Sequence, residues 1–228
     1  MNDIRKIFLF TYKDLLSEFR SREAITTMIV FSMLVVAIFN FTFETGSAVI
    51  SEAAPGIIWI AVTFSGMIGL NRSFVYEVDK GCLQGLLLIP MDRGVIYLGK
   101  MLGNFVFITI TELVSLPLFI VFFNLDFAAG IWHFLLILAL ANLGLSAVGT
   151  LFSAMAVNTK TRDVMLPILL FPIFVPVLMA AVSGTGEILR MGQNSEIPGW
   201  QFLIVTLVAF DMIFVTLCYL LFDYVMEE

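Results

Sequence analysis

Charged side chains are scarce in this sequence. Asp, Glu, Lys and Arg make up 13% of its 228 residues, whereas ordinary soluble domains carry roughly 25%. Hydrophobic residues make up 60%, and the mean hydropathy is +1.02. This composition excludes a water-soluble enzyme of the usual type and a disordered chain. With 12 Lys and Arg residues and a net charge of −6, the chain is also not a nucleic-acid binder that works by charge. A polytopic membrane protein remains.

Residues that carry cofactor chemistry are equally few. The two cysteines, Cys82 and Cys218, belong to no CxxC motif and set no disulfide framework. His133 is the single histidine, so one chain cannot supply two histidine ligands to a haem iron. The sequence contains no CxxCH motif for covalent haem attachment and no GxxxxGK[ST] motif to cradle ATP phosphates. We therefore expect a chain that is not itself an enzyme and binds no metal or cofactor directly.

Long apolar runs dominate what is present. A bilayer core of about 30 Å needs about 20 helical residues, each rising about 1.5 Å, and six runs meet this requirement. They predict an all-α membrane protein with a single domain over residues 1–228. The predicted spans cover residues 24–43, 54–70, 95–123, 131–157, 164–183 and 201–222.

The basic residues predict the orientation of these spans. With six spans, every Lys and Arg except Arg190 falls on one side of the membrane. Cytoplasmic loops carry the excess of Lys and Arg in membrane proteins. Both termini are therefore predicted to be cytoplasmic, and the opposite loops are too short to form a domain.

The first 23 residues are too polar to span a membrane but follow a helical pattern. Apolar positions recur with helical spacing, and the charged residues take the other positions. This pattern predicts a helix that lies in the cytoplasmic interface, either as a simple anchor or as part of a gate. The apolar positions are Ile4, Ile7, Phe8, Thr11, Leu15 and Phe19.

Residues 72–93 form the largest predicted cytoplasmic loop and contain a second amphipathic stretch. Its apolar positions are Val75, Val78, Cys82, Leu86 and Ile89. Pro90 ends it, because the residue before a proline is biased away from the helical conformation. Two small glycines keep one side of this helix narrow. It therefore suits either a groove on another protein or a position on the membrane surface.

Several motifs of this sequence resemble those of the CcmB family, the permease subunit of the ABC transporter of cytochrome c maturation. The resemblance covers nearly the whole chain, including its length and six spans. It rests on the runs APGIIWIA at 54–61, GLNRSF at 69–74, EVDKGCLQGLLLIP at 77–90, LGK at 98–100 and LPL at 116–118.

The resemblance implies partners in the bacterial cytoplasmic membrane. Permeases of this family pair with a dimer of a CcmA-like ATP-binding subunit and assemble with CcmC-like and CcmD-like membrane subunits. ATP hydrolysis in the family drives release of a haem-loaded CcmE-like chaperone. ATP would thus be bound by one partner and haem handled by others. Paired ATPases also imply a second copy of this chain.

The resemblance further assigns the stretch before Pro90 as the coupling helix that contacts the ATPase. A stiff helix joined to spans two and three converts a shift of the ATPase dimer into movement of the bundle. The residues assigned to this role are Glu77, Asp79, Lys80, Gly81, Gln84, Gly85, Leu86, Leu87 and Pro90.

Two carboxylates lie near the middle of predicted spans, Glu112 in the third and Asp211 in the sixth. An ionised carboxylate at that depth is costly, so each is expected to face protein, to pair or to be protonated. They form either a polar seam used in gating or docking, or neutral groups bonded to nearby threonines: Thr109, Thr111 or Thr206. Lys100 is expected to snorkel to the interface, since Glu112 is three turns away from it.

Other positions leave two interpretations open. Pro167, Pro172 and Pro176 predict that span five is kinked or locally unwound, either tolerated by packing or used for docking. Asn104 and Asn142, with the small residues of span four, predict close helix packing or a dimer interface. His133 beside Trp132 fits an interfacial aromatic belt better than a haem contact.

Three rival functions remain at this point. The chain could belong to another ABC exporter, for a drug, lipid or polysaccharide. It could be an ion-coupled secondary transporter with Glu112 and Asp211 as a proton relay, although no repeat links its two halves. It could also be a scaffold that only assembles the complex.

Overall fold

A computed structural model describes residues 3–43, 48–79, 92–128, 130–157, 159, 162–190 and 199–225. In these ranges the chain forms seven α-helices and no strand, so the all-helical class is confirmed. The helices are α1 (Asp3–Ser21), α2 (Glu23–Thr42), α3 (Ala48–Asp79), α5 (Arg93–Phe123), α6 (Ile131–Ala156), α7 (Arg162–Leu189) and α8 (Trp200–Val225).

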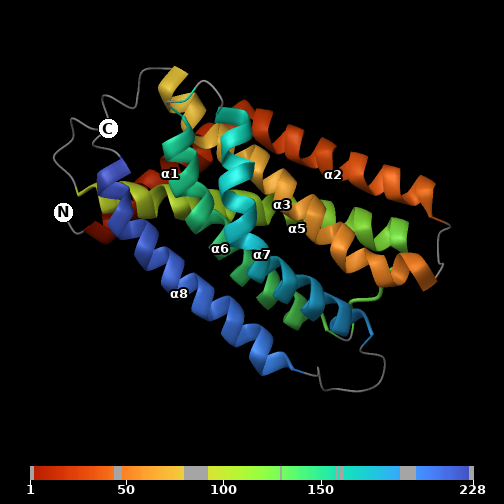
Figure 1. The fold of residues 1–228 in the computed structure, drawn as a ribbon. Helices are drawn as coiled ribbons and strands as arrows, with labels where there is room; N and C mark the ends of the chain where they lie inside the picture. The colour runs from red at the N-terminus through yellow and green to blue at the C-terminus, as the bar shows by residue number, and fades with distance from the viewer. Residues whose placement is uncertain are drawn as a thin grey trace.

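Six of these helices, α2 to α8, are long and apolar enough to cross a membrane, as predicted. They pack as one bundle with α3 and α6 at its centre (Figure 1). In each of these two helices 72% of the most apolar stretch is buried, against 22% in α8. The outer helices therefore leave most of their apolar stretches outside the bundle, which suits a surrounding solvent that is itself apolar.

Helix α1 lies outside the set of spans and packs along the first turns of α5. Its boundary with α2 is Arg22, whose φ of 58° is the left-handed conformation that ends a helix. The face turned away from the bundle exposes large apolar side chains, Phe8, Tyr12 and Leu16 among them. α1 is thus apolar on both sides, which fits a helix between bundle and lipid.

Both ends of the chain lie at the same end of the bundle (Figure 1). Near this end the Arg93 Nη1 donates a 2.9 Å hydrogen bond to the Asp223 carbonyl, and the rings of Tyr97 and Phe222 lie 5.3 Å apart. A separate small apolar core of α5, α6 and α8 side chains surrounds these rings. The distribution of Lys and Arg predicts that this end is cytoplasmic.

Two helices are longer than the hydropathy pattern predicts. α3 begins at Ala48, within the predicted outer loop, and continues to Asp79; α7 continues to Leu189 instead of ending at 183. Polar residues outside the lipid can extend a helix without adding hydropathy. Pro55 lies in the second turn of α3, early enough that few backbone bonds are lost.

The three prolines of α7 bend the helix but do not unwind it. The backbone is helical from Arg162 to Leu189, and Figure 1 shows the helix changing direction along its length. A proline removes one backbone donor and pushes the preceding turn aside. The predicted local unwinding is therefore wrong, and the kink is the outcome. α5 is likewise continuous through Pro117.

Candidate functional site

The predicted coupling segment, residues 72–93, is described at its two ends. Residues up to Asp79 continue α3 as one helix, so the backbone of Glu77 and Asp79 belongs to the last turns of α3, beyond the span that ends at Ser73. We expected a separate short helix after Arg72, but residues 72–79 belong to α3. The helix continues because no glycine or proline interrupts residues 70–79. Lys80, Gly81, Gln84, Gly85, Leu86, Leu87 and Pro90 lie outside the described residues.

At the other end of this segment, Asp92 starts α5. Its side chain accepts a 2.9 Å hydrogen bond from the Gly94 backbone N–H, the usual arrangement of an N-terminal cap. Gly94 also lies against α8, where a Cβ would be 2.3 Å from the Tyr219 ring. The start of α5 is therefore closely packed where the predicted segment joins the bundle.

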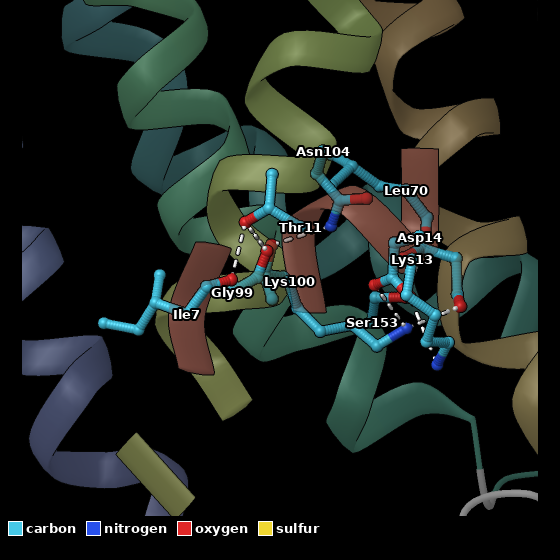
Figure 2. A network of polar contacts seen from close by, with 11 residues as sticks. Ile7, Thr11, Lys13, Asp14, Leu70, Gly99, Lys100, Asn104 and Ser153 are labelled. Atoms are coloured by element: carbon cyan, nitrogen blue, oxygen red, sulfur yellow. Dashed lines mark hydrogen bonds and ion pairs between the residues drawn. The ribbon is translucent and has the colours of Figure 1, made fainter. Parts of the chain in front are cut away.

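Lys100, on the second turn of α5, does not snorkel to the interface as expected. Its side chain is 2% exposed, and its Nζ lies 3.2 Å from Asp14 Oδ2 of α1. The same nitrogen donates a 3.3 Å hydrogen bond to the Ser73 carbonyl of α3 (Figure 2). A carboxylate on α1 and a backbone carbonyl thus hold the ammonium inside the bundle, which the α1 sequence pattern by itself did not indicate.

Close backbone contact brings Asp14 to this position. The Thr11 hydroxyl donates a 3.0 Å hydrogen bond to the Gly99 carbonyl across the α1–α5 contact (Figure 2). A Cβ at Gly99 would lie 2.7 Å from Phe10 Cβ, so only glycine allows this approach. Asp14 Oδ1 in turn lies 3.3 Å from Lys13 Nζ, which makes Asp14 a bridge between two ammonium groups.

A cavity of about 90 Å³ adjoins this ion pair between α1, α3 and α5. Its polar lining residues are Lys13, Asp14, Ser17, Glu18, Ser73, Lys100 and Asn104. Partial burial raises the pKa of Glu18, against a smaller opposing effect of a backbone hydrogen bond from Ala24. At the exposed start of α1, a hydrogen bond from Lys6 lowers the pKa of Asp3.

A line of polar contacts continues from the cavity into the bundle. Asn104 Nδ2 donates a 2.9 Å hydrogen bond to Thr150 Oγ1 of α6, and Ser153 Oγ donates a 2.7 Å bond to the Leu70 carbonyl of α3. These groups are buried and paired within the chain. They join α3, α5 and α6 at the end of the bundle where the predicted coupling segment begins.

Glu112 and Asp211 are both buried but have different surroundings. Glu112 Oε2 accepts a hydrogen bond from Asn142 Nδ2 of α6, which also donates to Thr109 Oγ1. The direct partner of Glu112 is therefore Asn142, in place of the threonines that the sequence suggested. Asp211 lies against α6, where a Cβ at Gly144 would be 2.8 Å from Asp211 Oδ1.

The small residues of α6 are used inside the chain. A Cβ at Gly144 would meet α8, and a Cβ at Gly149 would lie 2.4 Å from Leu70 Cδ1 of α3 and 3.3 Å from Leu170 Cδ1 of α7. Ser146 and Ala147 are buried as well. Close helix packing is thus the outcome, and this face of α6 is not available for a dimer interface.

At the opposite end of the bundle, two aromatic rings of different helices meet. The rings of His133 and Trp200 pack edge to face with centroids 4.8 Å apart, which joins the starts of α6 and α8. Within the described part of the chain, no three His, Cys, Asp or Glu side chains come together in a group that could hold a metal ion.

Comparison with known proteins decides the family. Residues 5–221 match the family described as CcmB protein, which is nearly the whole chain. This chain belongs to the CcmB family.

Individual relatives agree with this assignment. The CcmB chain is 26% identical over 191 residues to "Heme exporter protein B" of Pseudomonas aeruginosa, covering 84% of each protein. It is 26% identical over 171 residues to the protein of the same name from Rhodobacter capsulatus, covering 74% of this chain and 76% of the relative. The Haemophilus influenzae protein of that name is 27% identical over 164 residues, covering 72% and 74%. With its six spans, this CcmB chain is a multi-pass protein of the bacterial inner membrane.

Proposed function

We propose that this CcmB chain is the membrane subunit of a haem export complex of cytochrome c maturation, driven by ATP hydrolysis in a partner subunit. Membership of the CcmB family and the name of its relatives support the export role. The absence of a GxxxxGK[ST] motif from the sequence supports a separate ATP-binding chain. The chain itself is then a non-catalytic permease subunit.

The observation that carries the mechanical part of this proposal is the bond between Lys100 and Ser73. It joins the end of α3 to the start of α5, the two helices on either side of residues 80–91. Because both helices continue unbroken through the bundle, a displacement at their joined ends moves them as rigid elements. A partner that holds the segment between them can therefore shift two of the six spans.

The proposed partners follow the family. A CcmA-like dimer contacts Glu77, Asp79, Lys80, Gly81, Gln84, Gly85, Leu86, Leu87 and Pro90 at the cytoplasmic end, and a second copy of this chain completes the two-fold arrangement. A CcmC-like membrane subunit handles haem beside a small CcmD-like membrane subunit, and ATP hydrolysis releases the haem-loaded CcmE-like chaperone.

Bulky substitutions in the coupling segment test this proposal. Gly81→Trp and Gly85→Trp are expected to leave the chain in the membrane but to abolish co-purification of the ATP-binding subunit. Gly56→Trp is the matched control, because Gly56 lies near the opposite end of α3 and a Cβ there meets nothing within 4 Å. Retention of the ATP-binding subunit by both coupling variants would exclude these glycines from the interface.

Haem delivery is tested on the same preparations. A haem absorption spectrum of the co-purified complex and the release of haem-loaded chaperone on addition of ATP are the two readouts. We expect release from the complex of the unaltered chain and none from a complex with an ATPase-dead partner. Full release with the ATPase-dead partner would favour a scaffold.

A further inference from the structure

Lys100 joins three elements at the end of the bundle that is predicted to be cytoplasmic. Its Nζ lies 3.2 Å from Asp14 Oδ2 of α1 and 3.3 Å from the Ser73 carbonyl of α3, while its backbone belongs to α5 (Figure 2). The side chain is nearly inaccessible. One ammonium group thus connects α1 to both helices that flank the proposed coupling segment.

Helices α1 and α5 are in contact close enough for the two to move together. Thr11 is bonded to the Gly99 carbonyl, and Gly99 lets the backbone of α1 at Ile7 lie close to α5. A Cβ at Gly103 would lie 3.6 Å from Asp14 Cβ. Two glycines one turn apart therefore form the surface on which Asp14 is seated beside Lys100.

The ion pair between Lys100 and Asp14 is better suited to positioning α1 than to stabilising the fold. Removing two charges from water is costly, and an apolar pair of similar size often stabilises a protein as well or better. An ion pair instead fixes the position of α1 along α5, because the contact forms only when Asp14 lies beside Lys100. An ion pair between buried Lys100 and half-buried Asp14, at a close helix contact, is thus expected to fix where α1 sits.

We propose that Lys100 is a positioning residue that makes α1 move together with the ends of α3 and α5, so that a displacement of the coupling segment reaches α1. This inference rests on the proposed function for its source of movement. It adds to that function a second element, α1, that moves with each ATPase cycle.

A disulfide that replaces the ion pair tests this directly. The 3.6 Å separation at Asp14 and Gly103 falls within the range of about 3.5–4.5 Å between Cβ atoms that a disulfide requires. Asp14→Cys with Gly103→Cys is placed in a chain that also carries Cys82→Ser and Cys218→Ala. The complex with the ATP-binding subunit is purified into lipid nanodiscs, and ATP hydrolysis is measured before and after oxidation.

The expected result is a loss that oxidation reverses. The reduced double variant has a kcat about fivefold below that of the parent with an unchanged KM for ATP, since the nucleotide site lies in another subunit. Oxidation restores kcat, because a covalent bond now holds α1 on α5. A lower kcat after oxidation would mean that α1 must leave α5, and an unaffected reduced variant would mean that the pair positions nothing; either result overturns the proposal.

A second measurement separates this inference from the proposed function. Hydrogen exchange of the isolated chain needs no ATP-binding subunit, and Lys100→Met is expected to speed exchange in α1 and at the end of α3. The matched control is Arg190→Met, which removes an exposed cation and its 3.7 Å pair with Glu187 at the other end of the bundle. Unchanged exchange in α1 overturns the positioning role. Faster exchange together with failure of the ATP-binding subunit to co-purify instead overturns the proposed function and the transmission that depends on it.

Discussion

Trp59 Nε1 donates a 2.9 Å hydrogen bond to Thr185 Oγ1, and both side chains are buried. This bond joins α3 to α7 toward the end of the bundle opposite the termini. Trp59 belongs to the run of residues 54–61 that resembles the CcmB family. A Cβ at Gly186 would lie 3.7 Å from Pro55 Cγ of the same run, so Pro55 and Trp59 of this run lie on the face of α3 that packs on α7.

Replacing the indole tests the contribution of this bond. Trp59→Phe keeps an aromatic ring but leaves the Thr185 hydroxyl without its donor, which is expected to lower the free energy of unfolding by about 1–3 kcal/mol. Thermal unfolding in detergent measures the change. The control is Trp132→Phe, at a side chain that is 80% exposed, with an expected change below about 0.5 kcal/mol. Equal effects of the two substitutions would contradict the structural role of the bond.

Two glycines that differ in their surroundings predict opposite effects of an added methyl group. Gly149→Ala places a Cβ 2.4 Å from Leu70 Cδ1, inside the contact of α3, α6 and α7, and is expected to cost about 1–3 kcal/mol of stability. Gly56→Ala meets nothing within 4 Å and gains up to about 1 kcal/mol of helix propensity. Unfolding midpoints of both variants are measured together. A tolerated Gly149→Ala would show that this contact is looser than the structure indicates.

Two substitutions of Glu112 distinguish a structural role of its carboxyl group from a role in a proton relay. Glu112→Gln keeps an oxygen that accepts the hydrogen bond from Asn142, so we expect normal export and cytochrome c maturation. Glu112→Leu removes the acceptor and is expected to cost about 1–3 kcal/mol of stability. Cytochrome c maturation in cells and unfolding in detergent measure the two effects. If Glu112→Gln folds normally but abolishes maturation, the proton relay is favoured over this interpretation.

Glu18 predicts a pH dependence at the α1 contact. Burial raises the pKa of Glu18 above its ordinary value, so the folded chain binds the proton more tightly than the unfolded chain. Stability from this group is therefore present at low pH and is lost as pH rises through the raised pKa. Glu18→Gln removes the titrating carboxyl group and with it this pH-dependent part of the stability. The difference in unfolding temperature between parent and Glu18→Gln is measured across acidic and neutral pH, and a difference that does not change with pH would contradict the prediction.

Six spans and an all-helical fold could be predicted because they depend on local composition. A helix that crosses lipid must be apolar over its whole length and satisfy its own backbone bonds, so each span is visible in its own residues. The ends of α3 and α7 could not be predicted in this way. Beyond the lipid a helix continues on polar residues such as Arg72 and Glu187, which hydropathy does not separate from a loop.

The candidate site was predicted in part. Its glycine-bearing segment was assigned through the family resemblance, and its residues from 80 to 90 stay a prediction outside the described residues. Glu112 and Asp211 were recognised because a carboxylate in an apolar run is conspicuous. Their neighbours were not, since Asn142 and Gly144 lie on another helix and no periodicity records which helices meet.

By itself the sequence determined the class of the protein, the number of its spans, its family and the side of the membrane on which its cations are expected. The class, the spans and the side follow from which side chains lipid and water accept, one segment at a time, and the family follows from the resemblance of its motifs. Tertiary structure alone decided that Lys100 turns inward to Asp14 and Ser73, and that α1 rests on Gly99 and Gly103. A buried charge is stable only beside its partner, and that partner is brought to it by the packing of distant helices.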